Sequence, residues 1–172
     1  MTLHELNTLS RHQLIAELNK CCSSAAWINK MLPFFPADDL VELLEDAEEQ
    51  WFKCSEEDWK EAFAHHPKIG DINSLKKKFA STSHPIDIGW AVDEQSGIGD
   101  ASQNTIDALA EANRQYEDKF GYIFIVCATG KSAEEMLGIL QSRLSNDPKE
   151  EIEIAADEQN KITKLRLEKL LE

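Results

Sequence analysis

The chain has 172 residues, a formal net charge of −14 and 42% hydrophobic residues. Its length suits one domain with its own core, and its few glycines (seven) and prolines (five) favour helices over a turn-rich β fold. The acidic excess argues against non-specific nucleic-acid binding and against attachment to an anionic membrane surface. We therefore expect a single compact all-α domain over residues 1–172 that binds neither nucleic acid nor membrane.

The cysteines predict neither disulfides nor a zinc site. They are Cys21, Cys22, Cys54 and Cys127, and no pair has Cys-x-x-Cys spacing. No run of about 18 apolar residues could cross a bilayer, and the N-terminal residues lack the pattern of a signal peptide. These features predict a cytoplasmic protein with reduced, mostly buried thiols.

Three helices are expected in the first 52 residues, after an irregular arm over residues 2–9. The residues expected to cap them are Ser10, Ser23 or Ser24, and Asp38 or Asp39. Pro33–Pro36 breaks the second helix. The third has apolar residues at three- and four-residue spacing and glutamates elsewhere, which is typical of a helix with one solvated side.

A capped helix followed by a His-Pro corner is the most specific local pattern. Ser55 with Asp58 three residues later predicts the helix start. Pro67 disfavours helical geometry at His66, so the imidazole should lie beyond the helix C-terminus, where the dipole favours its protonated form. Gly70 then permits a sharp turn. Such a corner suits a general acid or base, although an ordinary helix end has the same pattern.

The second half begins with a short helix expected within Trp90–Gly97, which Gly97 could end and which carries Glu94 and Gln95 side by side. A long helix should then begin between residues 100 and 102 and end at Phe120. Two further helices are expected, with about eight in all. Their capping signals are Ser132 with Glu135, and Asp147 with Pro148.

Tyr122–Ala128 is the only strongly β-favouring run. Because no second such run exists to pair with it, we expect an extended or irregular buried segment and not a strand. The backbone N–H and C=O groups of such a segment need partners, which a planar ligand can supply.

Several chemistries remain open from residue types alone. A metal site would use histidines and cysteines, but neither H-x-x-x-H nor H-E-x-x-H occurs. A thiol nucleophile at Cys127 would lie in an apolar run, where a thiol is inert. A helical binding module would explain the acidic surface, but not the His-Pro corner. His66, Glu94, Gln95 and Arg166 could form a cofactor-free acid–base site, which spacing alone does not establish.

Short stretches spread over almost the whole chain resemble one known family in the family's own order. They are Cys21–Ser23 before Trp27, Asp58–Asp71, Glu94–Gly97, Phe120–Ala128, Arg143–Asp147 and Lys161–Leu167. The family is that of the 2-oxo-4-hydroxy-4-carboxy-5-ureidoimidazoline (OHCU) decarboxylases of the urate-to-allantoin pathway. The resemblance implies an all-α homodimer that forms (S)-allantoin without a metal or an organic cofactor.

The resemblance also implies a set of site residues. His66 matches the catalytic histidine, a general acid/base, and Glu94 matches its carboxylate partner. The implied substrate contacts are Pro67, Ala91, Gln95, Phe124, Ile125, Val126, Cys127, Ala128 and Arg166. The segment from Phe124 to Ala128 matches a stretch whose backbone holds the ureido and ring amides. Many members carry serine at the position of Ala91, so a hydroxyl contact is expected to be missing or replaced by backbone.

The chain also shows neither the fused hydrolase domain nor the peroxisomal tail of some relatives, which favours a bacterial-type cytosolic enzyme.

Overall fold

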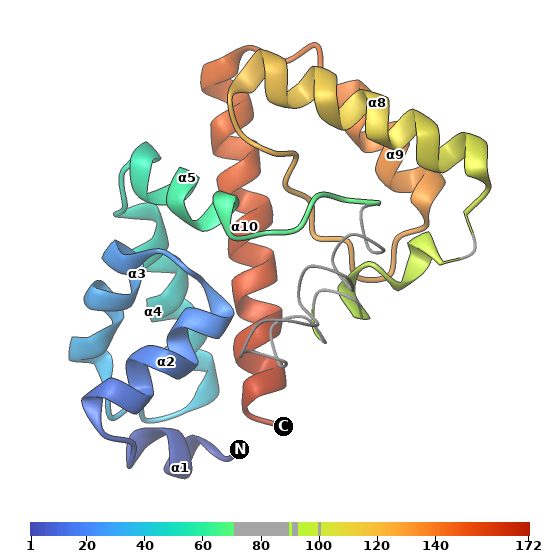
Figure 1. Cartoon of the computed structure of the whole chain (residues 1–172). Coiled ribbons are helices and arrows are strands. Elements are labelled where there is room, and N and C mark those ends of the chain that lie inside the picture. Colours follow the sequence, from blue (N-terminus) through green and yellow to red (C-terminus); the bar gives the residue numbers. More distant parts are fainter. Residues whose placement is uncertain (71–89, 91–92, 100) are drawn as a thin grey trace. The chain divides into compact units, whose positions relative to one another are not determined.

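The protein is all-helical. The computed structural model describes residues 1–70, 90, 93–99 and 101–172, and this part of the chain forms eight α-helices and two 3-10 helices, with no strand (Figure 1). The predicted all-α class is therefore confirmed. None of the helices in these ranges is long and apolar enough to cross a bilayer. The chain divides into two compact units, which are Met1–His65 with Ala156–Glu172, and His66–Ala155.

The first unit contains five α-helices and one 3-10 helix from the N-terminal part of the chain, together with the later residues of the last helix. Their bounds are α1 (Leu3–Asn7), α2 (Arg11–Cys21), α3 (Ala25–Met31), η1 (Leu32–Phe34), α4 (Leu40–Phe52), α5 (Glu56–Ala64) and α10 (Pro148–Leu170). Within this unit α3 packs against α2, α4 and α5. The N-terminal amine donates a hydrogen bond to the Leu170 carbonyl at 2.9 Å, so the two chain ends lie close together (Figure 1).

The predicted helix starts are confirmed, and each alternative is resolved. Ser10, Ser24, Asp39 and Ser55 each accept a hydrogen bond from a backbone N–H of the first helical turn. This is the arrangement that satisfies the unpaired donors of a helix N-terminus.

The expectation of an irregular arm over residues 2–9 is wrong, because residues 3–7 form α1. Thr2 and Glu5 make a reciprocal capping box at its start, and Leu6 is fully buried. The Thr-x-x-Glu spacing is the signal that identifies this short helix.

Indole N–H groups connect the helices of the first unit. Trp27 Nε1 donates to the Ala47 carbonyl at 3.0 Å, and Trp51 Nε1 donates to the Ala156 carbonyl at 2.9 Å. Both tryptophans are buried. Their rings thus supply apolar area while their one polar atom stays satisfied.

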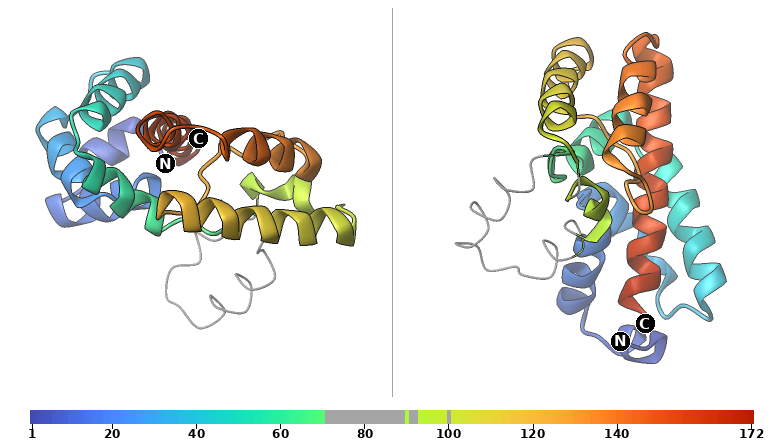
Figure 2. Two further views of the ribbon diagram at one scale, coloured as in Figure 1. Left: turned by 90° about the horizontal axis from the view of Figure 1, so that it is seen from above. Right: turned by 90° about the vertical axis from the view of Figure 1, so that its right-hand side faces the viewer.

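The second unit contains η2 (Ser96–Ile98), α8 (Gln103–Phe120), α9 (Ala133–Arg143) and the first residues of α10. The helix α8 begins after the predicted cap Ser102 and ends before Gly121, whose φ of 79° is left-handed. The views of Figures 1 and 2 agree that α8 and α9 lie side by side, and the two helices are in contact.

Candidate active site

His66 lies on a corner at the end of α5, as predicted. The helix ends at Ala64 with His65 as its C-cap, and His66 and Pro67 follow as half-buried residues. Pro67 cannot donate a backbone hydrogen bond and disfavours helix before it, so the chain leaves the helix here.

Two side chains hold the loop that follows His66. The Gly70 N–H donates to Gln95 Oε1 at 3.2 Å, and Asn113 Nδ2 donates to the Ile69 carbonyl at 2.9 Å. Gly70 has a φ of 89°, which confirms the predicted turn. The first of these bonds connects the loop after His66 to Gln95. The family resemblance, and not the spacing of the residues, implied that these two stretches belong to one site. Asn113 was not predicted, because its partner is 44 residues away.

The predicted helix end at Gly97 is wrong, because Gly97 lies inside the 3-10 helix η2. A Cβ atom at this position would lie 2.1 Å from the Lys131 carbonyl oxygen. The glycine is therefore required by close packing and not by helix termination. Just before η2, Glu94 is helical and Gln95 forms a turn, and both residues are buried. Ala91, a predicted substrate contact, lies outside the described residues.

Tyr122–Ala128 is an irregular segment without strand structure, as predicted, and residues 124–128 are all buried. Its Ile125 carbonyl accepts from Arg143 Nη1 at 2.8 Å, and its Cys127 carbonyl accepts from Lys131 Nζ at 2.7 Å. Within the described ranges, the backbone N–H groups of four residues in this segment donate no hydrogen bond. These residues are Phe124, Ile125, Val126 and Ala128.

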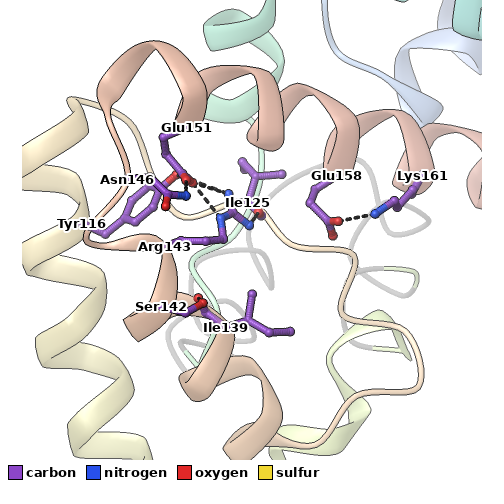
Figure 3. A network of polar contacts seen from close by, with 9 residues as sticks. All are labelled: Tyr116, Ile125, Ile139, Ser142, Arg143, Asn146, Glu151, Glu158 and Lys161. Atoms are coloured by element: carbon purple, nitrogen blue, oxygen red, sulfur yellow. Dashed lines mark hydrogen bonds and ion pairs between the residues drawn. The ribbon is translucent and has the colours of Figure 1, made fainter.

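A network of buried polar side chains contacts this segment through Arg143 (Figure 3). Glu151, which is 0% exposed, accepts from Arg143 Nε at 2.7 Å and from Asn146 Nδ2 at 2.8 Å. The Tyr116 hydroxyl also donates to Glu151. Burial, and then this hydrogen bond, raise the pKa of Tyr116 far above its ordinary value, so that the phenol stays neutral.

The role of this network was not predicted, although Arg143 lies in a stretch that resembles the family. A usable signal exists in the sequence. Arg143 follows Met136 and Leu140 on the buried face of α9, and Glu151 is followed by the buried Ile152 on α10. A buried charged group needs a partner of opposite charge, so these two positions indicate an ion pair between Arg143 and Glu151.

Arg166 belongs to the first unit, whereas the other predicted site residues in the described ranges belong to the second. It is buried on α10, and its Nη1 donates to the Lys20 carbonyl at 3.4 Å. The neighbouring Cys22 is also buried, and burial raises the pKa of its thiol to about 12. None of the four cysteines forms a disulfide and all four are buried, as expected. Thiols of this kind are poor nucleophiles.

Two further features bear on the other kinds of site that the residue types left open. No three His, Cys, Asp or Glu side chains among the described residues are grouped so that they could hold a metal ion. A cavity of about 400 Å³ lies beside the Lys68–Gly70 loop, between it and α8. None of the predicted catalytic or substrate-binding residues that the structure describes lines this cavity.

A family model described as OHCU decarboxylase matches residues 7–168. The chain belongs to the OHCU decarboxylase family. Among curated relatives, the uric acid degradation bifunctional protein TTL of Arabidopsis thaliana is 40% identical over 158 residues, which are 90% of this chain and 46% of that protein. The OHCU decarboxylase of Amia calva is 36% identical over 74 residues, or 43% of this chain and 39% of that one. The matched regions thus span less than half the length of each of these two relatives.

One solved structure supports the family assignment, and a second shares the fold. A crystal structure of OHCU decarboxylase in the presence of (S)-allantoin is 36% identical, with a TM-score of 0.70 over 90% of this chain and 96% of that chain. A crystal structure of (S)-allantoin synthase has a TM-score of 0.72 over 99% of this chain and 54% of that chain. At 16% identity the second likeness shows the fold alone.

Proposed function

We propose that this protein decarboxylates OHCU to (S)-allantoin in urate degradation, without a metal or an organic cofactor. Besides family membership, one observation carries the proposal. In the buried Phe124–Ala128 segment, the backbone N–H groups of Phe124, Ile125, Val126 and Ala128 have no acceptor within the described part of the chain. A buried N–H without an acceptor costs roughly 1–3 kcal/mol. The carbonyl oxygens of a ureido group and of an imidazolone ring are acceptors that would satisfy these donors.

The proposed reaction begins with cleavage of a carbon–carbon bond. The substrate carries a hydroxyl and a carboxylate on one ring carbon, next to an imine carbon that bears the ureido group. When carbon dioxide leaves, the bond electrons form a C=C bond between these two carbons, and the imine electrons move to nitrogen, which takes a proton. The hydroxyl then loses its proton to become the ketone of allantoin, while the former imine carbon gains a proton on one face.

His66 is the proposed acid–base group for these proton transfers, with Glu94 orienting its ring. The proposal is supported by the position of His66 just beyond the end of α5 and by the bond from Gly70 to Gln95, the residue after Glu94. A positioned acid–base group contributes about 10²- to 10⁴-fold to the rate.

The remaining predicted residues are proposed to bind substrate. Gln95 uses its carbonyl oxygen for Gly70, which leaves its amide N–H groups to donate to a substrate carbonyl. Arg166 is proposed to pair with the substrate carboxylate, since guanidinium–carboxylate bonds are among the stronger hydrogen bonds in proteins. Pro67 and Ala91 stay predictions as substrate contacts.

The deciding experiment follows optical activity while urate is converted through its oxidase and hydrolase in the presence of this protein. The intermediate decays by itself to racemic allantoin, so the enzyme should yield a lasting circular-dichroism signal of the S enantiomer. A racemic product at background rate with folded protein would contradict the proposal and would favour a helical binding module.

Replacing the imidazole tests its role directly. His66→Ala should lower kcat by about 10²- to 10⁴-fold and leave the fold unchanged, because the side chain is only half-buried. The matched control is His65→Ala, which removes the exposed neighbouring imidazole and should retain activity. A His66→Ala rate close to wild type would remove His66 from the mechanism.

Arg166→Ala should mainly raise KM, since the lost contact holds the substrate carboxylate before and during reaction. Lys161→Ala removes an exposed cation from the same helix and is the charge-matched control. Steady-state kinetics on both variants, with thermal unfolding to check the fold, separate the two effects. An unchanged KM in folded Arg166→Ala would contradict the assignment.

The homodimer implied by the family is also proposed for this protein. Sedimentation equilibrium should then give a mass of about twice the chain mass of 19.5 kDa. A mass of one chain at the concentrations of the assay would contradict it.

A further inference from the structure

Two cationic side chains hold alternate carbonyl groups of the buried segment. Arg143 Nη1 donates to the Ile125 carbonyl at 2.8 Å, and Lys131 Nζ donates to the Cys127 carbonyl at 2.7 Å. Both cations come from α9 or the turn that precedes it. The segment is thus tied to one helix at two points that lie two residues apart.

Each of these bonds also sets the direction of a backbone donor. The Ile125–Val126 and Cys127–Ala128 peptide bonds are trans. In a planar trans peptide the N–H points opposite to the C=O. Fixing the Ile125 and Cys127 carbonyls toward the cations therefore aims the Val126 and Ala128 N–H groups away from them. Neither N–H donates a hydrogen bond within the described part of the chain.

Arg143 is itself held so firmly that it can act as a fixed support. Its guanidinium contacts Glu151 Oε1 at 2.5 Å through Nη2 and at 2.7 Å through Nε (Figure 3). It also lies 4.7 Å from the centre of the Phe124 ring. One guanidinium therefore contacts both a side chain and a carbonyl of the segment.

Stability alone does not account for this arrangement. Replacing a buried ion pair by apolar residues of similar volume is often neutral or stabilising. What an apolar pair cannot do is donate to the Ile125 carbonyl, and that carbonyl governs where the next N–H points.

We propose that Arg143, held by Glu151, and Lys131 are positioning residues that aim the Val126 and Ala128 N–H groups at carbonyl oxygens of the substrate. The inference rests on the proposed decarboxylase function, and it identifies the urea-type carbonyls as the groups these donors recognise.

The first test compares kinetics of Lys131→Met, Lys131→Arg and the control Lys149→Met, which removes an exposed lysine of the same unit. Lys131→Met should lower kcat/KM by about 10-fold, the effect of one misdirected hydrogen bond. Lys131→Arg keeps a donor and should restore most of that loss. The control should match wild type.

The second test removes the buried pair as a unit with Arg143→Met/Glu151→Met, which avoids leaving one charge buried and unpaired. The folded double variant should lose about 100-fold in kcat/KM, the cost of misplacing a binding group by about 1 Å. If the double variant does not fold, the kinetics of the Lys131 variants test the proposal on their own.

Amide NMR with (S)-allantoin as the probe reads the donors themselves. In the wild type, the Val126 and Ala128 amide protons should shift downfield on binding. The shift of Ala128 should shrink in Lys131→Met, and that of Val126 in the double variant. If the wild type is active and the variants match it in both kinetics and amide shifts, the positioning roles are overturned. If the wild type itself is inactive, the proposed function is refuted instead.

Discussion

Gly97 shows how a single position can depend on a distant part of the chain. The Lys131 carbonyl oxygen, its carbon and the Ser132 Cα would lie 2.1, 3.0 and 3.2 Å from a Cβ atom added here. All three are backbone atoms, which cannot rotate away as a flexible side chain can. The glycine thereby lets η2, which follows directly after Glu94 and Gln95, pack against the start of α9.

We predict that Gly97→Ala destabilises the protein by about 1–3 kcal/mol, the usual cost of overpacking. The matched control is Gly138→Ala, because Gly138 is an exposed residue of α9 whose added Cβ would meet no atom within 4 Å. That change should stabilise the protein by about 0.5–1 kcal/mol, since alanine is the better helix former. Urea unfolding measures both changes, and equal effects of the two substitutions would contradict the packing argument.

At the scale of the element, α9 is the helix on which the proposed site depends most. It begins at a reciprocal capping box, in which Ser132 N donates to Glu135 Oε2 at 2.7 Å and Glu135 N donates to Ser132 Oγ at 3.2 Å. Arg143 lies at its last residue, and Lys131 lies just before its cap. Local chemistry at the helix start thus supports both proposed positioning residues.

The capping box makes part of the stability of α9 depend on pH. Hydrogen bonds from the backbone and then the side chain of Ser132 lower the pKa of Glu135 below its ordinary value of 4.5. The charged carboxylate is therefore the form that the folded state favours. Its contribution should be complete above pH 4.5 and should be lost as the pH falls through the lowered pKa.

We predict that Glu135→Gln is less stable than wild type at neutral pH and that this difference shrinks as the pH falls below 4.5. Glu153→Gln, which changes an exposed glutamate of α10, serves as the control and should show a much smaller difference at neutral pH. Thermal unfolding across the pH range measures both. A difference between wild type and Glu135→Gln that does not change with pH would contradict the role of the charge.

At the scale of the whole molecule, the excess of 32 acidic over 18 basic side chains produces self-repulsion. Its local effect is visible on α4, where burial and then the nearby Glu49 and Glu45 raise the pKa of Asp46. Surface ion pairs oppose this repulsion only weakly, at about 0–1 kcal/mol each. Repulsion should therefore dominate the response to salt.

We predict that sodium chloride raises the urea midpoint of unfolding, since the screening length falls to about 10 Å at 0.1 M. The slope of the transition should not change. Glu45→Gln, which removes one exposed charge from the α4 cluster, should be more stable than wild type at low salt and should respond less to salt. A midpoint that falls with salt would show that ion pairs dominate instead.

Much of the secondary structure could be predicted from the sequence because helix starts and ends are local events. The caps Ser10, Ser55 and Ser132 each act on a residue three positions away, and Pro67 acts on its own neighbour. The same locality made the His66 corner visible. It also shows why α1 could have been found, since its signal, Thr2 with Glu5, is equally short-ranged.

Only the tertiary structure revealed the groups that hold the proposed site together. Arg143 and Ile125 are 18 residues apart, Asn113 and Ile69 are 44 apart, and Gly97 lies against Lys131. The sequence by itself determined the all-α class, most of the helix starts, the His66 corner and the irregular buried segment, because neighbouring residues specify each of these. Only the tertiary packing determines which side chains bind the carbonyl groups of this segment. Polar groups that are far apart in the chain become buried together, and buried polar groups need hydrogen-bond partners.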